Sequence, residues 1–396
     1  MIFEYRDKSD FSIKVNHNVS LGKTAVFMMA FIVVIINVIY PFILNRQYSS
    51  NIEPAEIFSS NYEKIGQMIN YSTTFIGQIS WIDDENIPEK IQSANTSKCR
   101  LCYFHPNNQI SDSTRKDLIL GVLYGSTPNN LLTLVRSIRT TGCKASIVML
   151  ATDSVISDIG ERYLREVERC GVTFLPLPNF YRVNGIHGNL LRHLYFAIFL
   201  NKYWKEFDRV VVLDVYDTFF QKDPFTPDFD MKHVTFSYES VKFGKNGVNM
   251  LWMSRLDPKF TQEYYNEKVP LCTGLFAGSI KQLIHFYDQF VNLSYWEWVE
   301  FKAQDQGTLN YMFYSNMFDN IVIDFNNKFV SAFLFNFESG HSYNDLVKIV
   351  NGITPSVIHQ YDRKEQSTNF IKNNCPILGE WQFEPYGKYD WHDIGL

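Results

Sequence analysis

A stretch of 22 uncharged residues between Lys23 and Arg46 places the strongest constraint on this chain. It reads TAVFMMAFIVVIINVIYPFILN, and only Asn37 and Pro41 interrupt its apolar character. A helix of this length spans the roughly 30 Å hydrocarbon core of a bilayer, where an α-helix satisfies its own backbone polar groups. The sequence therefore predicts one transmembrane helix over residues 24–45.

The flanking charges predict the orientation of this helix. Four cations precede it, whereas Arg46 is the only cation in the 17 residues that follow. By the positive-inside rule, residues 1–23 form a cytoplasmic tail and the remainder faces the lumen of the secretory pathway. The alternative is a cleaved signal peptide, but its apolar region would be shorter, and no small-residue cleavage site follows Leu44. We expect a single-pass type II membrane protein.

The rest of the chain has features that suit an oxidising, glycosylating compartment. Acceptor triplets for N-glycans begin at Asn70, Asn95 and Asn292, and all six cysteines follow the apolar stretch. Cys99 and Cys102 have no second matching pair to complete a zinc site, so they are interpreted as a structural thiol pair or a disulfide. The spacing leaves the disulfide connectivity open.

Composition excludes one class of partner and favours another. The net charge is −5, and no basic run follows the apolar stretch, so nucleic acid is not an expected partner. Aromatic residues reach 16%, a surplus that suits a cleft stacking on nucleotide bases or sugar faces. Residues 46–115 alternate polar and short apolar stretches and are predicted to form a lumenal stem, and residues 116–396 a large lumenal domain.

From Leu118 onward, apolar runs of strand length alternate with segments of helical periodicity. Such alternation predicts an α/β domain in which helices flank a mixed, mostly parallel sheet, because parallel strands need crossover connections. The expected strands are 118–125, 145–153, 172–178, 209–213, 232–239, 249–254, 321–324 and 356–359. The expected helices are 128–142, 155–171, 188–207, 280–292 and 305–314.

The segment RVVVLDVYDTFFQKDPF is the most informative about chemistry. Its apolar strand is followed by Asp214, Asp217 and Asp223 within ten residues. Ligands of open α/β sheets bind beyond the carboxyl ends of strands, and clustered carboxylates repel one another unless a hard cation such as Mg²⁺ or Mn²⁺ joins them. A solvated acidic turn is the competing interpretation, and we favour it for Asp223, which precedes a proline.

This acidic segment resembles the metal-binding aspartate motif of GT-A-fold glycosyltransferases, which use nucleotide-sugar donors. The resemblance extends from Leu118 to Arg363. CTGLFAGS (272–279) is similar to the family's acceptor-side strand and turn, AQDQGTLNYMFY (303–314) to its Asp-Gln helix, and SVIHQYDR (356–363) to its late His segment. The resemblance implies that residues 116–396 form a catalytic domain with a GT-A-like, Rossmann-like fold.

The spacing of the aspartates departs from the family pattern. The usual motif is Asp-X-Asp, whereas Asp214 and Asp217 are three apart and would project to opposite faces of a regular strand. A turn or bulge after Asp214 must bring them together. By analogy, Asp217 is the direct ligand of Mn²⁺ or Mg²⁺, and Asp214 contacts the ribose or supports the cation site. His359 is a candidate third ligand, with a purely structural role as the alternative.

Further site residues follow from their positions in the fold. Tyr124, Gly125 and Ser126 end the first strand, where the nucleotide is expected, although a plain strand-to-helix turn explains them equally well. Arg192 and Arg363 are candidates for binding the donor phosphates, with a surface role as the alternative. Asp305 is the candidate catalytic carboxylate, acting as a base or a nucleophile, and it also sits where it would cap a helix.

Two other functions compete with a transferase. VVLDVYDTFF also resembles the first motif of haloacid-dehalogenase-type phosphatases, with Asp214 as nucleophile and Thr218 four residues later. The general-acid position of that motif holds Tyr216, however, and several strand–helix units come before it. A catalytically inert carbohydrate-binding protein on the same fold is the other alternative. We favour a transferase acting on a glycan, glycoprotein or glycolipid acceptor.

Overall fold

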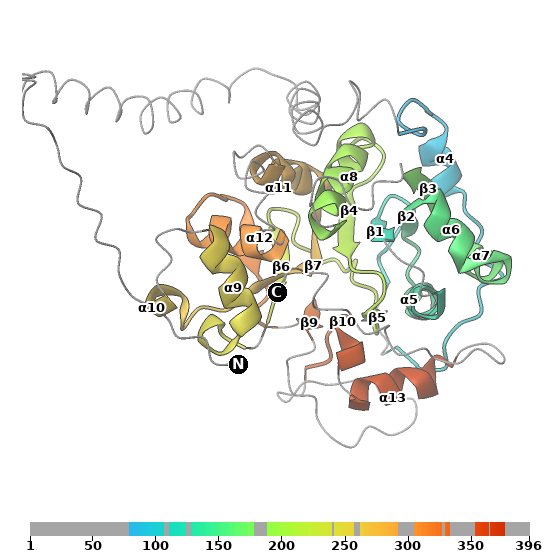
Figure 1. Ribbon diagram of the computed structural model, residues 1–396. Coiled ribbons are helices and arrows are strands. Elements are labelled where there is room, and N and C mark those ends of the chain that lie inside the picture. Colours follow the sequence, from blue (N-terminus) through green and yellow to red (C-terminus); the bar gives the residue numbers. More distant parts are fainter. Residues whose placement is uncertain are drawn as a thin grey trace, which may run out of the picture. The chain divides into compact units, whose positions relative to one another are not determined.

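A seven-stranded sheet forms the centre of the described structure (Figure 1). The structure is a computed structural model that describes residues 79–106, 111–123, 128–177, 188–239, 241–256, 262–291, 305–326, 329–332, 353–363 and 365–376. All of these lie in one unit, Ile57–Leu396. The strand order is β3-β2-β1-β4-β7-β6-β8, and only the two pairings of β7 are antiparallel. The expected α/β class, with a mixed and mostly parallel sheet, is confirmed.

The strands coincide with the apolar runs of the sequence. Every residue of β1, β2 and β7 is buried, as expected for strands covered on both faces. The bounds of the seven strands are β1 Leu118–Leu123, β2 Ser146–Thr152, β3 Val172–Leu177, β4 Arg209–Leu213, β6 Val234–Tyr238, β7 Leu271–Ser279 and β8 Ile321–Ile323.

Helices pack on both faces of the sheet and create two hydrophobic cores. In β1, Leu118 and Leu120 belong to one core and Ile119 to the other, because successive side chains point to opposite faces. The first core includes residues of α4 (Ile87–Gln92), α8 (Gly188–Lys202), α11 (Ile280–Val291) and α12 (Asp305–Tyr314). The second includes residues of α5 (Pro128–Thr140), α6 (Asp153–Ile159) and α7 (Glu161–Glu168).

The segment 155–171 was expected as one helix and forms two. Between α6 and α7, Gly160 adopts φ 82° and ψ 143°, which interrupts the helical backbone at a position that glycine tolerates. The first helix also starts earlier, because the Thr152 side chain accepts a hydrogen bond from the Val155 backbone N–H and caps it. The expectation of a single helix is wrong at this glycine.

Residues 249–254 were expected as a strand and belong to helix α9 (Gly247–Leu256). The Asn249 backbone N–H donates to the Asn246 side chain at 3.2 Å and so caps the first turn. Helix α12 packs against α9 at Gly307, where an added Cβ would lie 2.8 Å from an α9 side chain. The strand expectation is wrong, because periodicity does not separate a short buried helix from a buried strand.

A second, three-stranded sheet lies beyond the end of β4. Its order is β5-β10-β9, formed by Thr218–Phe220, Val357–His359 and Val330–Ala332. Strand β10 runs antiparallel to β5 and places His359 opposite Thr218. A 3₁₀ turn (Tyr361–Arg363) and α13 (Glu365–Asn374) follow, and together with Cys102 and Phe104 they enclose a third hydrophobic cluster. Two short elements, Phe243–Lys245 and α10 (Gln262–Tyr265), complete the described structure.

The segment before β1 packs on the α/β sheet from Ile79 onward. Ile79 and Trp81 are buried in the first core, and the Trp81 indole N–H donates to Pro176 O at 2.9 Å. Two disulfides strengthen this attachment, so the expected disulfide bonding is confirmed. Each cysteine of the Cys99/Cys102 pair has a distant partner: the bonds are Cys99–Cys170 and Cys102–Cys375.

Removing the disulfide between Cys102 and Cys375 by alanine substitution at both positions is expected to lower the free energy of unfolding by about 2–5 kcal/mol. The bond joins residues separated by 273 positions, so its loss frees much of the unfolded chain. Denaturant unfolding of the full chain measures the change. Cys143→Ala, which removes a buried free thiol, is the control, and an equal loss in both variants would contradict the prediction.

No helix in the described part of the chain is long and apolar enough to cross a membrane. The stretch 24–45 lies outside the described residues, so the transmembrane helix stays a prediction.

Candidate active site

A turn after β4 brings the first two aspartates together. The Asp214 backbone N–H donates to Gly274 O at 2.7 Å, and the Thr218 hydroxyl donates to Asp214 O at 2.6 Å. Candidate ligand atoms of Asp214, Asp217 and His359 all lie within 4.8 Å of one another. The structure therefore contains the turn that the Asp-X-X-Asp spacing requires.

His359 reaches the aspartates through the pairing of β10 with β5. Its Nε2 lies 3.3 Å from Asp217 Oδ1 and 3.6 Å from Asp214 Oδ2. The next residue, Gln360, has φ 60°, and this left-handed turn directs the Tyr361 N–H to Asp217 O at 3.4 Å. Burial lowers the pKa of His359, but Asp217, Cys272 and Asp214 more than offset that effect, so the pKa lies well above its ordinary value.

The donor set fits a divalent cation. In the described part of the chain, Asp217 Oδ1 and His359 Nε2 are buried without a hydrogen-bond partner, although they approach within 3.3 Å. Buried polar atoms are rarely left unsatisfied, and a shared cation would satisfy both. Two carboxylates and one imidazole could together hold a divalent cation, and its identity as Mn²⁺ or Mg²⁺ stays a prediction. Asp214 is about one-third exposed (32%), so the group is reachable from solvent.

Arg192 of α8 connects the candidate cation-binding group to Asp305. One guanidinium nitrogen bonds Asp214 Oδ1, and another lies 2.6 Å from Asp305 Oδ2. Burial would raise the pKa of Asp214, but Arg192 and His359 hold it below its ordinary value. Because Arg192 is buried and bridges two carboxylates, its guanidinium also fixes their relative position. Its contact with a donor phosphate stays a prediction.

Asp305 is a buried carboxylate at the first position of α12. Its Oδ1 accepts the Gln306 backbone N–H at 2.8 Å, and its Oδ2 lies 3.1 Å from His193 Nε2. Burial would raise the pKa of Asp305, but Arg192 and His193 hold it far below its usual range, so the carboxylate is ionised at neutral pH. Its catalytic role stays a prediction.

His193 belongs to this network but was not identified from the sequence. His193 is adjacent to Arg192 on α8, and burial lowers its pKa despite the neighbouring Asp305 carboxylate. A neutral imidazole therefore donates from Nε2 to Asp305, and Tyr287 OH lies 3.5 Å from its Nδ1. The Asp-Gln sequence predicted the helix that carries Asp305. No feature of the sequence predicted its contact with His193, which lies more than 100 positions earlier.

Glu239 was also missed, and it holds the start of α12 in place. Its carboxylate accepts hydrogen bonds from Asn246, Asn249 and Gln306 at 2.8–2.9 Å. Burial raises the pKa of Glu239, although these donors and Arg363 act in the opposite direction. Since Gln306 directly follows Asp305, this buried network helps to fix the catalytic candidate.

The other predicted site residues have different outcomes. Tyr124, Gly125 and Ser126 lie outside the described residues. Arg363 is exposed to solvent in the turn after His359, although the surrounding protein partly desolvates its guanidinium. This desolvation lowers its pKa, but Asp217 and Asp362 raise the pKa more. Its neighbour Asp362 was not singled out from the sequence. Burial and the nearby Asp217 raise the pKa of Asp362 to about 6.

Asp223, the third aspartate of the acidic segment, lies in a different environment. Its Oδ2 accepts hydrogen bonds from the Ser111 and Ser113 hydroxyls at 2.5 Å, and its Oδ1 accepts the Phe225 N–H at 3.0 Å. These contacts tie the turn to the segment before β1. Asp223 therefore has a turn role, but it is only 3% exposed, so the expectation of a solvated acidic turn is wrong.

Gly274 on β7 provides the space in which the group assembles. A Cβ at this position would lie 2.2 Å from His359 Cε1 and 2.6 Å from Asp214 Oδ2. Gly274→Ala is therefore expected to displace both side chains and weaken Mn²⁺ binding about tenfold or more. Titration of Mn²⁺ into the full chain, with free Mn²⁺ read by electron paramagnetic resonance, measures the change. Gly247→Ala is the control, because nothing lies within 4 Å of its added Cβ, and equal affinity in both variants would contradict the prediction.

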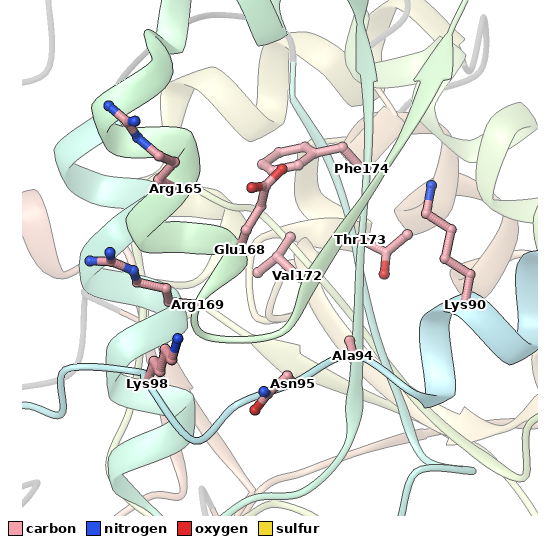
Figure 2. A pocket seen from close by; sticks show the side chains of 10 residues that line it. All are labelled: Lys90, Ala94, Asn95, Lys98, Arg165, Glu168, Arg169, Val172, Thr173 and Phe174. Atoms are coloured by element: carbon pink, nitrogen blue, oxygen red, sulfur yellow. The ribbon is translucent and has the colours of Figure 1, made fainter.

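A separate pocket of about 540 Å³ lies beside the edge strand β3 (Figure 2). Lys90, Lys98, Arg165 and Arg169 line it, but the two arginine head groups point away from Phe174 in this view. Both arginines pair with glutamates of α7, Arg165 with Glu161 at 3.8 Å. The cations do not converge on one point, and none of the predicted site residues lines this pocket.

No protein-family model matches the sequence, and no curated protein is significantly similar to it. The functional inference therefore depends on the chemistry of the site.

Proposed function

We propose that this protein is a glycosyltransferase that uses Mn²⁺ or Mg²⁺ to move a sugar from a nucleotide-sugar donor to a glycan, glycoprotein or glycolipid acceptor. The supporting observation is the group Asp214, Asp217 and His359, assembled just beyond the end of β4. This is the side of an α/β sheet where ligands bind. A GT-A-like form of the α/β fold is part of the proposal.

The location proposed for this activity is the lumen of the Golgi or endoplasmic reticulum, with a type II membrane anchor. Disulfides persist in oxidising compartments, and the two described here suit such a location. Nucleotide sugars as donors and a membrane-attached catalytic domain are consistent with one another in that compartment.

Each residue of the site has a role in the proposed reaction. Asp217 and His359 hold the cation, and Asp214 contributes a further oxygen while Arg192 orients it. A cation held there supplies positive charge that stabilises the departing nucleoside diphosphate. Arg363, exposed after His359, binds the diphosphate from the protein side.

Asp305 is the proposed catalytic carboxylate. It is ionised, because Arg192 and His193 hold its pKa low. As a base it would take the proton of the acceptor hydroxyl, and as a nucleophile it would attack the anomeric carbon. His193 and Gln306 fix its orientation in either role.

The decisive experiment is a screen of nucleotide sugars against the purified full chain with Mn²⁺ and with Mg²⁺. Release of nucleoside diphosphate and transfer to a panel of glycan, glycopeptide and glycolipid acceptors are measured. We expect at least one donor to be consumed in a cation-dependent way, with the activity lost in Asp217→Asn and retained in Asp228→Asn, whose carboxylate is exposed. The absence of both hydrolysis and transfer across the panel would refute the proposal.

The phosphatase alternative makes a different prediction at Asp214. A phosphatase of that class forms a phospho-aspartate, which beryllium fluoride mimics. In this structure the Asp214 carboxylate pairs with Arg192, and the general-acid position is Tyr216. Binding of beryllium fluoride that depends on Asp214 would support the phosphatase over the transferase.

Cation affinity is expected to rise with pH, up to about tenfold per unit, because one proton leaves His359 when the cation binds. The pKa of His359 is raised well above its ordinary value, so the metal-free imidazole is protonated at neutral pH and must lose that proton. The dependence levels off once the pH passes the raised pKa. Mn²⁺ titrations between pH 6 and 8 measure the slope.

Two histidine variants test the source of this slope. His285→Gln removes a half-exposed imidazole at the surface and should leave the slope unchanged. His359→Gln should bind Mn²⁺ weakly with a much smaller slope. A pH-independent affinity in the unaltered chain would contradict the prediction.

A further inference from the structure

Cys272 is a free, buried thiol that lies against His359. Its Sγ is 3.5 Å from His359 Nδ1, and the residue is only 1% exposed. Four of the six cysteines form the two disulfides, and the other free thiol, Cys143, belongs to the second hydrophobic core. The position of Cys272 therefore differs from that of every other cysteine in the chain.

Strand β7 explains why the thiol and the imidazole meet. Cys272 and Gly274 are two positions apart on this strand, so they share one face. Cys272 contacts Nδ1 of His359, while Gly274 leaves room for its Cε1. Strand β7 thus lies against one side of the imidazole. The position of His359 itself is fixed by the pairing of its strand, β10, with β5.

The two nitrogens of His359 have different surroundings. Nε2 faces Asp214 and Asp217, whereas Nδ1 faces the sulfur of Cys272. An imidazole that binds a cation through Nε2 must carry its proton on Nδ1, and that N–H needs an acceptor that fixes the tautomer and the ring orientation. A cysteine sulfur is a weak acceptor, and within the described residues it is the only hydrogen-bond partner of this nitrogen.

We infer that Cys272 is a positioning residue for the cation site: its sulfur accepts the Nδ1–H of His359 and directs the Nε2 lone pair toward Asp214 and Asp217. The inference rests on the proposed function, in which this group holds Mn²⁺ or Mg²⁺. Cys272 itself does not touch the cation. Its effect is on the strength of cation binding, through the orientation of His359.

Serine and alanine at position 272 form a matched pair for the test. The two side chains are similar in size, and only serine retains an acceptor for the Nδ1–H. Mn²⁺ is titrated into the full chain, and free Mn²⁺ is read by electron paramagnetic resonance, so the readout does not depend on activity. Cys272→Ala is expected to bind Mn²⁺ about tenfold more weakly. This is the lower end of the range expected when a metal-ligating side chain loses its hydrogen-bond partner.

Cys272→Ser is expected to recover most of the affinity, and Cys143→Ala to retain all of it. If the alanine variant fails to fold, Cys272→Val replaces it, since valine fills the space without an acceptor. Equal affinity in Cys272→Ala and the unaltered chain, or equally weak binding by the serine and alanine variants, would overturn the inference about Cys272. Either result would leave the proposed cation site unaffected. An unaltered chain that binds no Mn²⁺ would overturn the proposed cation site and this inference with it.

Discussion

Asp217→Asn is expected to weaken Mn²⁺ binding at least about 100-fold and to leave the protein folded. The loss of affinity should exceed that seen when a metal-ligating side chain merely loses its hydrogen-bond partner. Asp217 Oδ1 is buried beside His359 Nε2 and has no hydrogen-bond partner among the described residues, so the substitution removes a ligand charge and, within the fold, weakens only the ion pair with His359. Mn²⁺ titration and thermal unfolding of the full chain measure the two properties separately.

Asp223→Asn is the matched control for this prediction. It lies six positions later in the same acidic segment, and its carboxylate accepts hydrogen bonds from Ser111, Ser113 and the Phe225 backbone. We expect this variant to lose about 1–3 kcal/mol of stability and to keep its Mn²⁺ affinity. Retained Mn²⁺ binding in Asp217→Asn, or equal loss of binding in both variants, would refute the assignment of Asp217 as a ligand.

Arg192→Ala is expected to lower the free energy of unfolding by about 3–5 kcal/mol, the cost of leaving buried charges without their partner. Arg192 contacts both Asp214 and Asp305, and the Asp305 side chain is only 4% exposed. Its removal leaves the buried Asp305 carboxylate and the one-third exposed Asp214 carboxylate without the guanidinium that they share. Urea unfolding of the full chain at pH 7 measures the loss.

The loss should shrink as the pH falls. In the unaltered chain, the low pKa of Asp305 contributes stability that is present above the unfolded pKa and is lost as the pH falls toward the folded value. In Arg192→Ala, Asp305 stays buried but lacks the guanidinium, so its pKa is higher than in the unaltered chain. Protonation of Asp305 at lower pH then removes the buried charge that destabilises the variant. The difference between the two proteins is therefore largest near neutrality.

Arg165→Ala is the control for charge removal. Arg165 is 65% exposed and lies 3.8 Å from Glu161 in a surface pair, which contributes about 0–1 kcal/mol. If Arg192→Ala costs no more than Arg165→Ala, the bridge between the two carboxylates does not stabilise the fold. Arg192→Lys should lie between them, because a single ammonium lacks the fork that reaches both carboxylates.

The sheet could be predicted from the sequence because its strands are buried on both faces. Continuous apolar runs such as those of β1, β2 and β4 have few alternatives once amphipathic segments separate them. Helix α9 could not be predicted in this way, because its apolar run has no clear period and its start depends on Asn246. Gly160 ends α6 because its backbone adopts a positive φ. A single glycine in an amphipathic segment does not predict that conformation.

The site shows the same division between local and distant information. Asp214 and Asp217 were found because they follow one strand, and the turn between them was required by their spacing. His359 was named through the resemblance, but its contact with Asp217 depends on the pairing of β10 with β5. His193, Glu239 and Cys272 came only from the structure, since each acts through a residue far away in the sequence.

The pairing of β10 with β5 has a consequence for the order of events during synthesis. Asp214 and Asp217 leave the ribosome more than 140 residues before His359, and β5 has no partner in its sheet until β10 follows. The bond between Cys102 and Cys375 cannot form until later still. The proposed cation site is thus absent from every nascent chain that stops short of β10, and it becomes complete only when almost the entire polypeptide has been made.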